Sequence, residues 1–507
     1  MVWKPIVLSF CALAMFSSGV AVADDVTFEE LLQRLQAAET RVNALENQLP
    51  GGSLYREASF NQPADEADSD DEKKEVGELE ALTKKWEEKW EKQEATNDEL
   101  KSSIKKSVQS GSSGTKSMKI SGRIHTDYWS FPDSTPGINQ LETGNPAITP
   151  QDRFGFRRVR FGVGGDVSPN MAYRIEMEFA GGNKTEFRDV YISMNDVSFF
   201  NTVIVGNHKR PYGLDHMNSS RYNVFIERPF VIESFNQDAR RLGISSNGVS
   251  DDEQWNWRYG VWNQRLIQDE GNYVSDHLQG EIAGRLARTY WYDDSSDGRG
   301  YAHWGIAGTI AHPDGSAGPG SATNEARFQH RPEARSSSKW LDTKVIPGAS
   351  WYEMIGVEKV VNIGALQMVG EYQTMFMQRD AGYKDLFLHG GYAYVSYFLT
   401  GEHIPWDRTT GNLGRVKPFE DFFLVDRCDG SVGRGWGAWQ IAARYSYADF
   451  VDQDVIGGIG QSVTLGVNWR WNANAGLQMN YIMGEINNSS GLSGNYDIIG
   501  ARFMIDF

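Results

Sequence analysis

Apolar and polar residues alternate with a period of two along most of the chain from Met118 onward. Successive side chains of a β-strand point to opposite faces, so each alternating segment predicts a strand with one apolar and one polar face. Turn-forming residues between the segments predict antiparallel hairpins, with short turns at one end and long loops at the other. The longest loop, Pro313 to Thr343, should face outside. The predicted strands include Ile120 to Tyr128, Tyr173 to Phe179, Val190 to Met194, Trp257 to Val261, Ile282 to Tyr290, Tyr392 to Phe398, Gln440 to Tyr447, Val463 to Trp471 and Leu477 to Tyr481.

The last seven residues, Ala501 to Phe507, repeat this alternation and finish on a phenylalanine, which is typical of a transmembrane β-barrel. A bilayer core offers no water to unpaired backbone groups, so only helices and closed barrels span it. Beyond the first two dozen residues, no apolar run approaches the roughly 18 to 20 residues that a membrane helix needs. The pattern therefore predicts an all-β transmembrane barrel over residues 115–507.

The first 23 residues have the pattern of a signal peptide. Lys4 supplies a positive start, Ile6 to Phe16 an apolar core, and Ala21-Val22-Ala23 a cleavage site, so the mature chain should begin at Asp24 and be exported. Removal of this segment leaves Cys428 as the single cysteine. An intrachain disulfide is then impossible, and stability must come from the hydrogen bonds and packing of the sheet.

Residues 24–114 carry a helical pattern in place of the alternation. Phe28 to Leu49 has apolar residues at heptad spacing, Pro63 to Glu72 is an acidic linker, and Glu75 to Val108 forms a second amphipathic pattern. We predict an α-helical coiled coil in the periplasm, associating as a homotrimer and able to contact a periplasmic or cell-wall partner. For each segment a solvated helix without a partner remains an alternative.

The formal net charge of -17 is distributed unevenly. Between Asp24 and Lys106 lie 22 acidic and 12 basic residues, so most of the negative charge belongs to the helical segment and the predicted barrel is only mildly acidic. Aromatic residues make up 12% of the chain, which suits the aromatic belts of a barrel at the two membrane interfaces. Bulk charge does not indicate which ions a pore passes.

Several segments of the barrel region form a series in order along the chain: Phe156 to Asp166, Gly206 to Leu214 with Ser219 to Arg221 and Ile226 to Pro229, Arg240 to Gly243, Leu399 to His403 with Trp406 to Arg408 and Gly414 to Pro418, and Gly437 to Tyr447. Together they resemble one family, the phosphate-selective porins O and P, over about residues 118 to 507. The resemblance implies a sixteen-stranded, trimeric outer-membrane barrel that passes anions through a narrow, arginine-lined channel.

Strand parity alone predicts which of these arginines line a lumen. Val159 and Phe161 share the apolar face of their strand, so Arg158 and Arg160 share the opposite, inward face, and the same parity turns Arg123 inward. A guanidinium stays charged and offers a planar fork of donors that matches phosphate oxygens. A series of such groups could pass a partly dehydrated anion from site to site.

The resemblance adds further candidate residues. It implies an anion-binding role for Arg157, although strict alternation would turn that side chain toward lipid unless it lies at a strand end or bulge. It also implies a constriction in which Arg221, on an inward-folded loop, lies near Asp189 on the barrel wall. Further candidates, for which an interface or loop charge is the alternative, are Lys209, Arg210, Arg228, Arg241 and Arg285.

Motifs for other functions are missing. The sequence has no G-x-S-x-G, no H-E-x-x-H and no P-loop, its nine histidines are scattered, and no basic and aromatic platform suggests nucleic acid. We therefore predict no catalytic residue, metal site or cofactor. The predicted function is that of an outer-membrane porin selective for anions, with inorganic phosphate or polyphosphate as its solute. The outer wall of the barrel should contact membrane lipid. A weakly selective general porin and an envelope tether with a periplasmic stalk are the alternatives.

Overall fold

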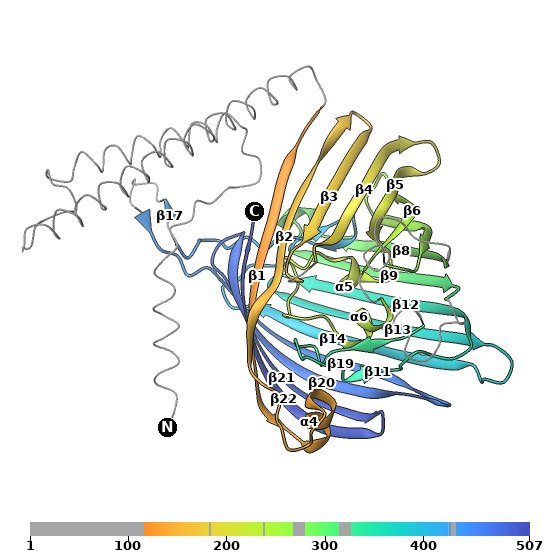
Figure 1. The fold of residues 1–507 in the computed structure, drawn as a ribbon. Helices are drawn as coiled ribbons and strands as arrows, with labels where there is room; N and C mark the ends of the chain where they lie inside the picture. Colours follow the sequence, from red (N-terminus) through yellow and green to blue (C-terminus); the bar gives the residue numbers. More distant parts are fainter. Residues whose placement is uncertain are drawn as a thin grey trace, which may run out of the picture. The chain divides into compact units, whose positions relative to one another are not determined.

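In the computed structural model, residues 116–181, 184–236, 239–266, 279–313, 326–423, 425–426 and 432–507 are described. Sixteen antiparallel strands in these residues form one closed barrel, which confirms the predicted barrel fold. Figure 1 shows the arrangement of these strands. The predicted signal peptide and coiled coil lie outside the described residues. Among the described helices, none combines the length and apolar character needed to cross a membrane.

The barrel strands follow one another around the ring in chain order. They are β1 (Lys119–Ser134), β2 (Arg153–Ser168), β3 (Met171–Glu178), β4 (Glu186–Val197), β5 (Asn201–Lys209), β6 (Arg240–Val249), β7 (Trp255–Asn263), β8 (Gly280–Tyr292), β9 (Gly300–Ala311), β12 (Ala349–Ile363), β13 (Leu366–Arg379), β14 (Leu386–Phe398), β19 (Ala438–Asp452), β20 (Val455–Arg470), β21 (Ala475–Ser489) and β22 (Leu492–Asp506). Every strand segment predicted from the alternation overlaps one of these strands.

The barrel closes between its first and last strands. Arg123 of β1 is the register partner of Asp506 of β22, and the backbone N–H of Gly122 donates to the carbonyl of Phe507 at 2.7 Å. Closure leaves no unpaired edge, as a membrane-spanning sheet requires. We call the end of the barrel at Phe507 the terminal end and the opposite end the loop end.

Side chains alternate between the two faces of the wall as predicted. On β1, Ile120 and Ile124 are 55% and 40% exposed on the outer face, whereas Arg123, His125 and Asp127 are nearly fully buried on the inner face. The outer face is therefore apolar and suits lipid, and the inner face is polar.

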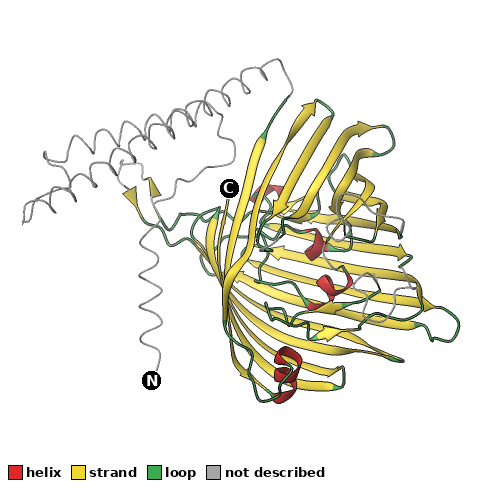
Figure 2. Cartoon of the chain, in the orientation of Figure 1, coloured by secondary structure: helices red, strands yellow, loops and turns green. Residues whose placement is uncertain are grey.

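The connection between β5 and β6 folds into the barrel. Residues 210–236, which we call the inner loop, contain the short helices α5 (Leu214–Met217) and α6 (Phe230–Phe235), which lie inside the ring of strands in Figures 1 and 2. The carboxylate of Glu371 on β13 accepts the backbone N–H groups of Leu214 and Asp215 at 2.9 and 2.7 Å. This carboxylate satisfies donors that the start of α5 leaves free, and it fixes the loop to the wall.

The long connection between β9 and β12 folds inward over residues 326–348, so the prediction that Pro313 to Thr343 faces outside is wrong for its described residues 326–343. These residues form the hairpin of β10 (Gln329–His330) and β11 (Leu341–Asp342), and Trp340 and Leu341 are completely buried. The carboxylate of Glu333 accepts from Arg444 of β19 at 2.9 Å and from the backbone N–H of Phe230 at 3.1 Å. Apolar burial and this carboxylate hold the segment against the inner loop.

A second departure from prediction is a long connection at the terminal end, where the alternation predicts short turns. Residues 399–437 join β14 to β19 and contain the small hairpin of β15 (Trp406–Asp407) and β16 (Asn412–Leu413). The ring of Trp406 stacks on Tyr301 at 5.3 Å, and the backbone N–H of Leu413 donates to Asn218 of the inner loop at 3.0 Å. This hairpin therefore reaches into the lumen and meets the inner loop there.

Candidate functional site

Arg157 and Arg158 are adjacent on β2, and both turn inward because β2 bulges at Arg157. His125 is the register partner of Arg158 and Thr126 that of Phe156, so Arg157 has no partner on β1. The extra residue of a bulge shifts the parity of the side chains. The bulge that the sequence analysis required for Arg157 is present, and Arg157 and Arg158 lie together on the lumen side.

Arg158 is the exceptional member of the pair. Its side chain is nearly fully buried, its Nη1 lies 3.4 Å from Nδ1 of His125, and its Nε has no hydrogen-bond partner. Of the residues that the structure describes, no carboxylate comes within 4 Å of this guanidinium. A buried cation without a counter-charge is costly, so Arg158 provides a place where an anion would be stabilised.

Arg157, in contrast, is neutralised by Glu227 of the inner loop. The guanidinium donates Nε to Oε1 at 2.7 Å and Nη2 to Oε2 at 3.0 Å, and Arg502 of β22 contacts the same carboxylate at 2.7 Å. Burial alone would raise the pKa of Glu227, but the charges of Arg157 and Arg502 hold it well below its ordinary range. Glu227 therefore ties the loop to strands on both sides of the barrel closure.

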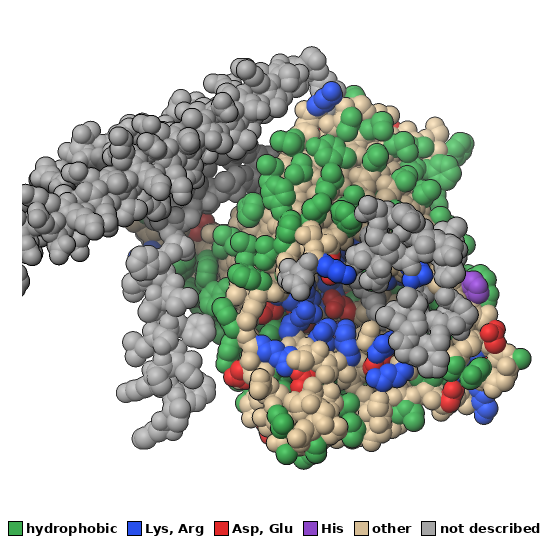
Figure 3. Space-filling model, in the orientation of Figure 1, with side chains coloured by type: hydrophobic (Ala, Val, Ile, Leu, Met, Phe, Trp, Pro, Cys, Tyr) green, Lys and Arg blue, Asp and Glu red, His purple; other side chains and the backbone are tan. Residues whose placement is uncertain are grey.

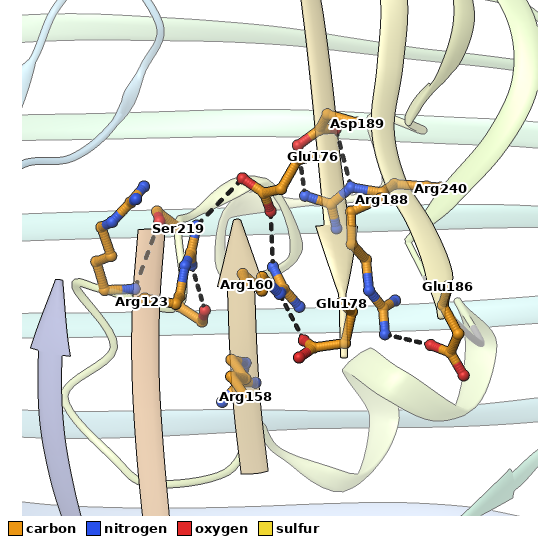
Figure 4. A network of polar contacts seen from close by, with 12 residues as sticks. Arg123, Arg158, Arg160, Glu176, Glu178, Glu186, Arg188, Asp189, Ser219 and Arg240 are labelled. Atoms are coloured by element: carbon orange, nitrogen blue, oxygen red, sulfur yellow. Dashed lines mark hydrogen bonds and ion pairs between the residues drawn. The ribbon is translucent and has the colours of Figure 1, made fainter. Parts of the chain in front are cut away.

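The inner wall of the first six strands carries a connected group of charges, which we call the inner-wall cluster (Figure 4). Glu176 is its centre, with Arg174 at 2.8 Å, Arg160 at 3.2 Å and Arg123 at 3.6 Å. Arginines outnumber carboxylates, so the cluster keeps excess positive charge. Its members are Arg123, Arg160, Arg174, Arg188 and Arg240 with Glu176, Glu178, Glu186 and Asp189. Arg158 lies beside them on β2 and forms no ion pair with a described residue.

The predicted proximity of Arg221 and Asp189 is wrong. Asp189 accepts both arms of Arg240, at 2.9 and 2.7 Å, as Figure 4 shows. Arg221 instead reaches the barrel closure, where its Nε lies 2.9 Å from Asp506 of β22. A bidentate partner from β6 already occupies Asp189, and the inner loop extends past β4 toward the terminal strand.

The five remaining candidates differ in their partners. Arg210 pairs with Glu281 at 2.7 Å, Arg228 with Asp215 at 2.8 Å, and Arg285 with Glu358. Arg241 donates to the backbone carbonyl groups of Arg240 and Gln264. The ammonium of Lys209 donates to two carbonyl groups of the inner loop, those of Met217 and Asn218, at 2.8 and 2.9 Å. The contacts of Lys209 and Arg210 fix the inner loop to the wall, and that of Arg228 lies within the loop. Those of Arg241 and Arg285 join wall strands and their connections.

Toward the loop end, a cavity of about 110 Å³ opens between the inner loop and residues 326–348. Arg331, Arg335 and Lys339 line it together with the carboxylates of Glu227, Glu233 and Glu333. Figure 3 shows Lys and Arg side chains gathered in the hollow of this face. Repulsion by Arg157 and then burial lower the pKa of Arg335 to about 10. Burial and the neighbouring Arg331 lower the pKa of Lys339 to about 8. We call these three residues the vestibule cations.

Sequence reasoning missed several inward residues. Arg444 and Arg502 follow the parity of predicted strands, Arg444 beside outward Tyr445 and Arg502 beside outward Phe503, so the alternation itself could have identified them. Arg240 lies at a strand start, where parity is ambiguous. The carboxylates that neutralise the arginines had no sequence signal, because Glu227 and Glu333 come from loops far from their partners in the chain.

Comparisons with known proteins place the barrel region in one sequence family. The profile described as phosphate-selective porin O and P matches residues 119–507. An uncharacterised protein of Caulobacter vibrioides is 26% identical over 407 residues, which cover 78% of this chain and 75% of that protein. Porin O of Pseudomonas aeruginosa is 23% identical over 412 residues, which cover 75% of this chain and 86% of porin O.

Solved structures of outer-membrane barrels also resemble the chain. The trimer form of OmpT, an outer membrane protein of Vibrio cholerae, has a TM-score of 0.46 and 13% identity, covering 77% of this chain and 100% of OmpT. The anion-selective porin from Comamonas acidovorans has a TM-score of 0.45 and 15% identity, covering 77% of this chain and 100% of that porin.

Proposed function

Because the chain belongs to the phosphate-selective porin O and P family, and is therefore an outer-membrane porin, we propose that it conducts anions selectively and takes phosphate or polyphosphate as its preferred solute. Arg158 is the observation that carries this proposal. It is a buried guanidinium in the lumen with no described carboxylate within 4 Å, beside Arg157 and Arg160. An anion that has lost part of its hydration regains donors there.

The carboxylates of the lumen complete the mechanism. Conduction requires binding that is favourable enough to admit an ion and weak enough to release it. Glu227 and Glu176 neutralise Arg157 and Arg160, the arginines on either side of Arg158. A passing anion therefore meets one arginine without a described carboxylate partner between arginines whose charge is partly neutralised. The vestibule cations gather anions before they reach these arginines. The arginines of the lumen thus attract an anion, and the neighbouring carboxylates allow it to leave.

Two further parts of the proposal concern assembly. The barrel forms a homotrimer, which its family membership supports, and residues 24–114 lie in the periplasm as the predicted coiled coil. The terminal end, which carries most of the short turns, then faces the periplasm.

The proposal is tested by the reversal potential of the purified protein in a planar bilayer across a potassium chloride gradient. We expect anion selectivity despite the net charge of -17, and a chloride current that millimolar phosphate inhibits. Local donors should dominate because charges more than roughly 8 to 10 Å from the lumen are screened in physiological salt. A cation-selective wild type would refute the proposal, and chloride current indifferent to phosphate would indicate a general porin.

Lys339 should make anion capture depend on pH. With its pKa at about 8, the side chain is charged below that pH and neutral above it, so the vestibule loses a positive charge between pH 7 and 9. We expect chloride conductance at low salt to fall by about twofold to fivefold over this interval. Chloride is the suitable ion because it does not titrate.

Lys339→Arg is the matched control for this prediction, since arginine keeps its charge throughout the range. Its conductance should stay level from pH 7 to 9. An equal decline in Lys339→Arg and wild type would show that another group causes the dependence.

A further inference from the structure

One row of outward residues crosses seven adjacent strands near the terminal end of the barrel. Register partners connect each member to the next, from β7 through β8, β9, β12, β13 and β14 to β19. In this order they are Trp255, Arg288, Trp304, Lys359, Gly370, Ala393 and Tyr445. The row therefore joins a segment of alternating aromatic and cationic residues to a segment of small residues.

The cationic segment presents two charges on the outer wall. The ammonium of Lys359 donates to the hydroxyl of Tyr290 at 2.6 Å and lies 4.4 Å from the centre of its ring. The guanidinium of Arg288 lies 5.0 Å from the ring centre of Trp255. In the described part of the chain, neither cation has a carboxylate within 4 Å. Both therefore keep an unneutralised positive charge on a face that is otherwise apolar.

Beside Lys359 the wall is hollowed into an apolar groove of about 590 Å³. Gly370, Gly391 and Ala393 form its floor, because three small residues meet on adjacent strands. Tyr372 and Tyr445, 44% and 49% exposed, stand at its sides. The groove has room for an acyl chain, and its apolar lining faces the membrane.

The order of charge and groove along the strands matches the order of groups in a phospholipid. Lys359 lies four residues before Ile363, the last residue of β12 at the terminal end, which is about 13 Å along the strand at about 3.3 Å per residue. The next outward row, with Val357 and Tyr372, continues the groove toward the loop end and thus deeper into the bilayer. The cations are at the level of headgroups, and the groove extends toward the hydrocarbon.

We propose that this surface binds one anionic phospholipid, with its headgroup phosphate on Lys359 and Arg288 and an acyl chain in the groove over Gly370. Charge complementarity selects an acidic headgroup, since a cation on a lipid-facing wall loses hydration and a phosphate oxygen replaces it. The location of the groove on the membrane wall makes a lipid the occupant. This site is separate from the lumen and independent of which ion the pore conducts.

The test uses the full-length protein in a zwitterionic detergent, with native mass spectrometry to count bound lipids during titration with phosphatidylglycerol or phosphatidylcholine. We expect one tightly bound phosphatidylglycerol and weaker binding of phosphatidylcholine. Lys359→Gln should weaken phosphatidylglycerol binding about fivefold, equivalent to about 1 kcal/mol for one cation near a membrane surface. Lys384→Gln, an exposed lysine in the connection between β13 and β14, should leave it unchanged.

A second variant tests the groove without altering charge. A Cβ built at Gly370 meets no atom closer than 3.4 Å, so the strand should accept Gly370→Leu, whose side chain fills the floor. We expect it to weaken phosphatidylglycerol binding about tenfold with Lys359 intact. Wild-type binding in both variants would overturn the proposal, as would equal affinity of the wild type for both lipids. A loss of oligomer with retained lipid in Gly370→Leu would identify the groove as a protein interface instead and also overturn it.

Discussion

Replacing Arg158 with glutamate should abolish or reverse the anion selectivity of the channel. The substitution changes the local charge by two units at the buried position that lacks a counter-charge, and the new carboxylate would pair with the neighbouring arginines. At an effective dielectric constant of about 20, two charges 4 Å apart interact by about 4 kcal/mol. We expect the anion-to-cation permeability ratio to fall at least about tenfold, which corresponds to about 1.4 kcal/mol.

Reversal potentials across a salt gradient measure this ratio directly. Lys384→Glu is the matched control, because it makes the same change of charge on an exposed lysine in a connection at the loop end. It should alter the ratio little, since the charge is screened by solvent and salt. Arg221→Glu should have a smaller effect than Arg158→Glu, because Asp506 already neutralises Arg221. Unchanged selectivity in Arg158→Glu would show that another position selects the anion.

Glu227→Gln should make the pore bind phosphate more tightly and conduct it more slowly. The substitution removes the carboxylate that Arg157 contacts through both arms, so a second guanidinium beside Arg158 becomes free for the anion. We expect the phosphate concentration that half-inhibits chloride current to fall about tenfold. The maximal phosphate current should also fall, because release becomes slower.

The same variant should depend on phosphate for its stability. Breaking one side of a buried ion pair costs about 3–5 kcal/mol when nothing replaces the lost charge, so added phosphate should raise the unfolding temperature more in Glu227→Gln than in wild type. Glu233→Gln is the control, since Glu233 is in the same loop, is 35% exposed and lies 3.5 Å from Arg228. Identical phosphate inhibition in all three proteins would contradict the role assigned to Glu227.

The alternation of the sequence predicted the parts of the fold that depend on local chemistry. A period of two predicts a strand whatever the strand packs against, and it correctly placed Arg123 and Arg158 on the inner face. The same rule failed at Arg157, because a bulge changes parity without changing composition. It also gave no signal for the hairpin that the residues after Phe398 form in the lumen.

The candidate site was less predictable because its charges meet through tertiary contacts. Arg502 and Glu227 are 275 positions apart, and no local pattern indicates that they touch. The resemblance to relatives suggested Asp189 for Arg221, but in this chain Arg240 occupies Asp189 with both arms. Parity predicts where a side chain points, whereas its partner depends on how the loops fold inside the barrel.

The contacts of β22 have a consequence for the order in which the channel is assembled. Asp506 binds Arg221 of the inner loop at 2.9 Å and Arg415 of the terminal-end hairpin at 2.7 Å, while Arg502 reaches Glu227. These loop contacts require β22 to be in place beside β1, because both loops bind side chains of β22. A barrel that is still open lacks these anchors, and its inner loop is held by contacts to other strands, such as those of Glu371 and Glu281. The two loops thus gain their full set of charged anchors only when the wall becomes continuous.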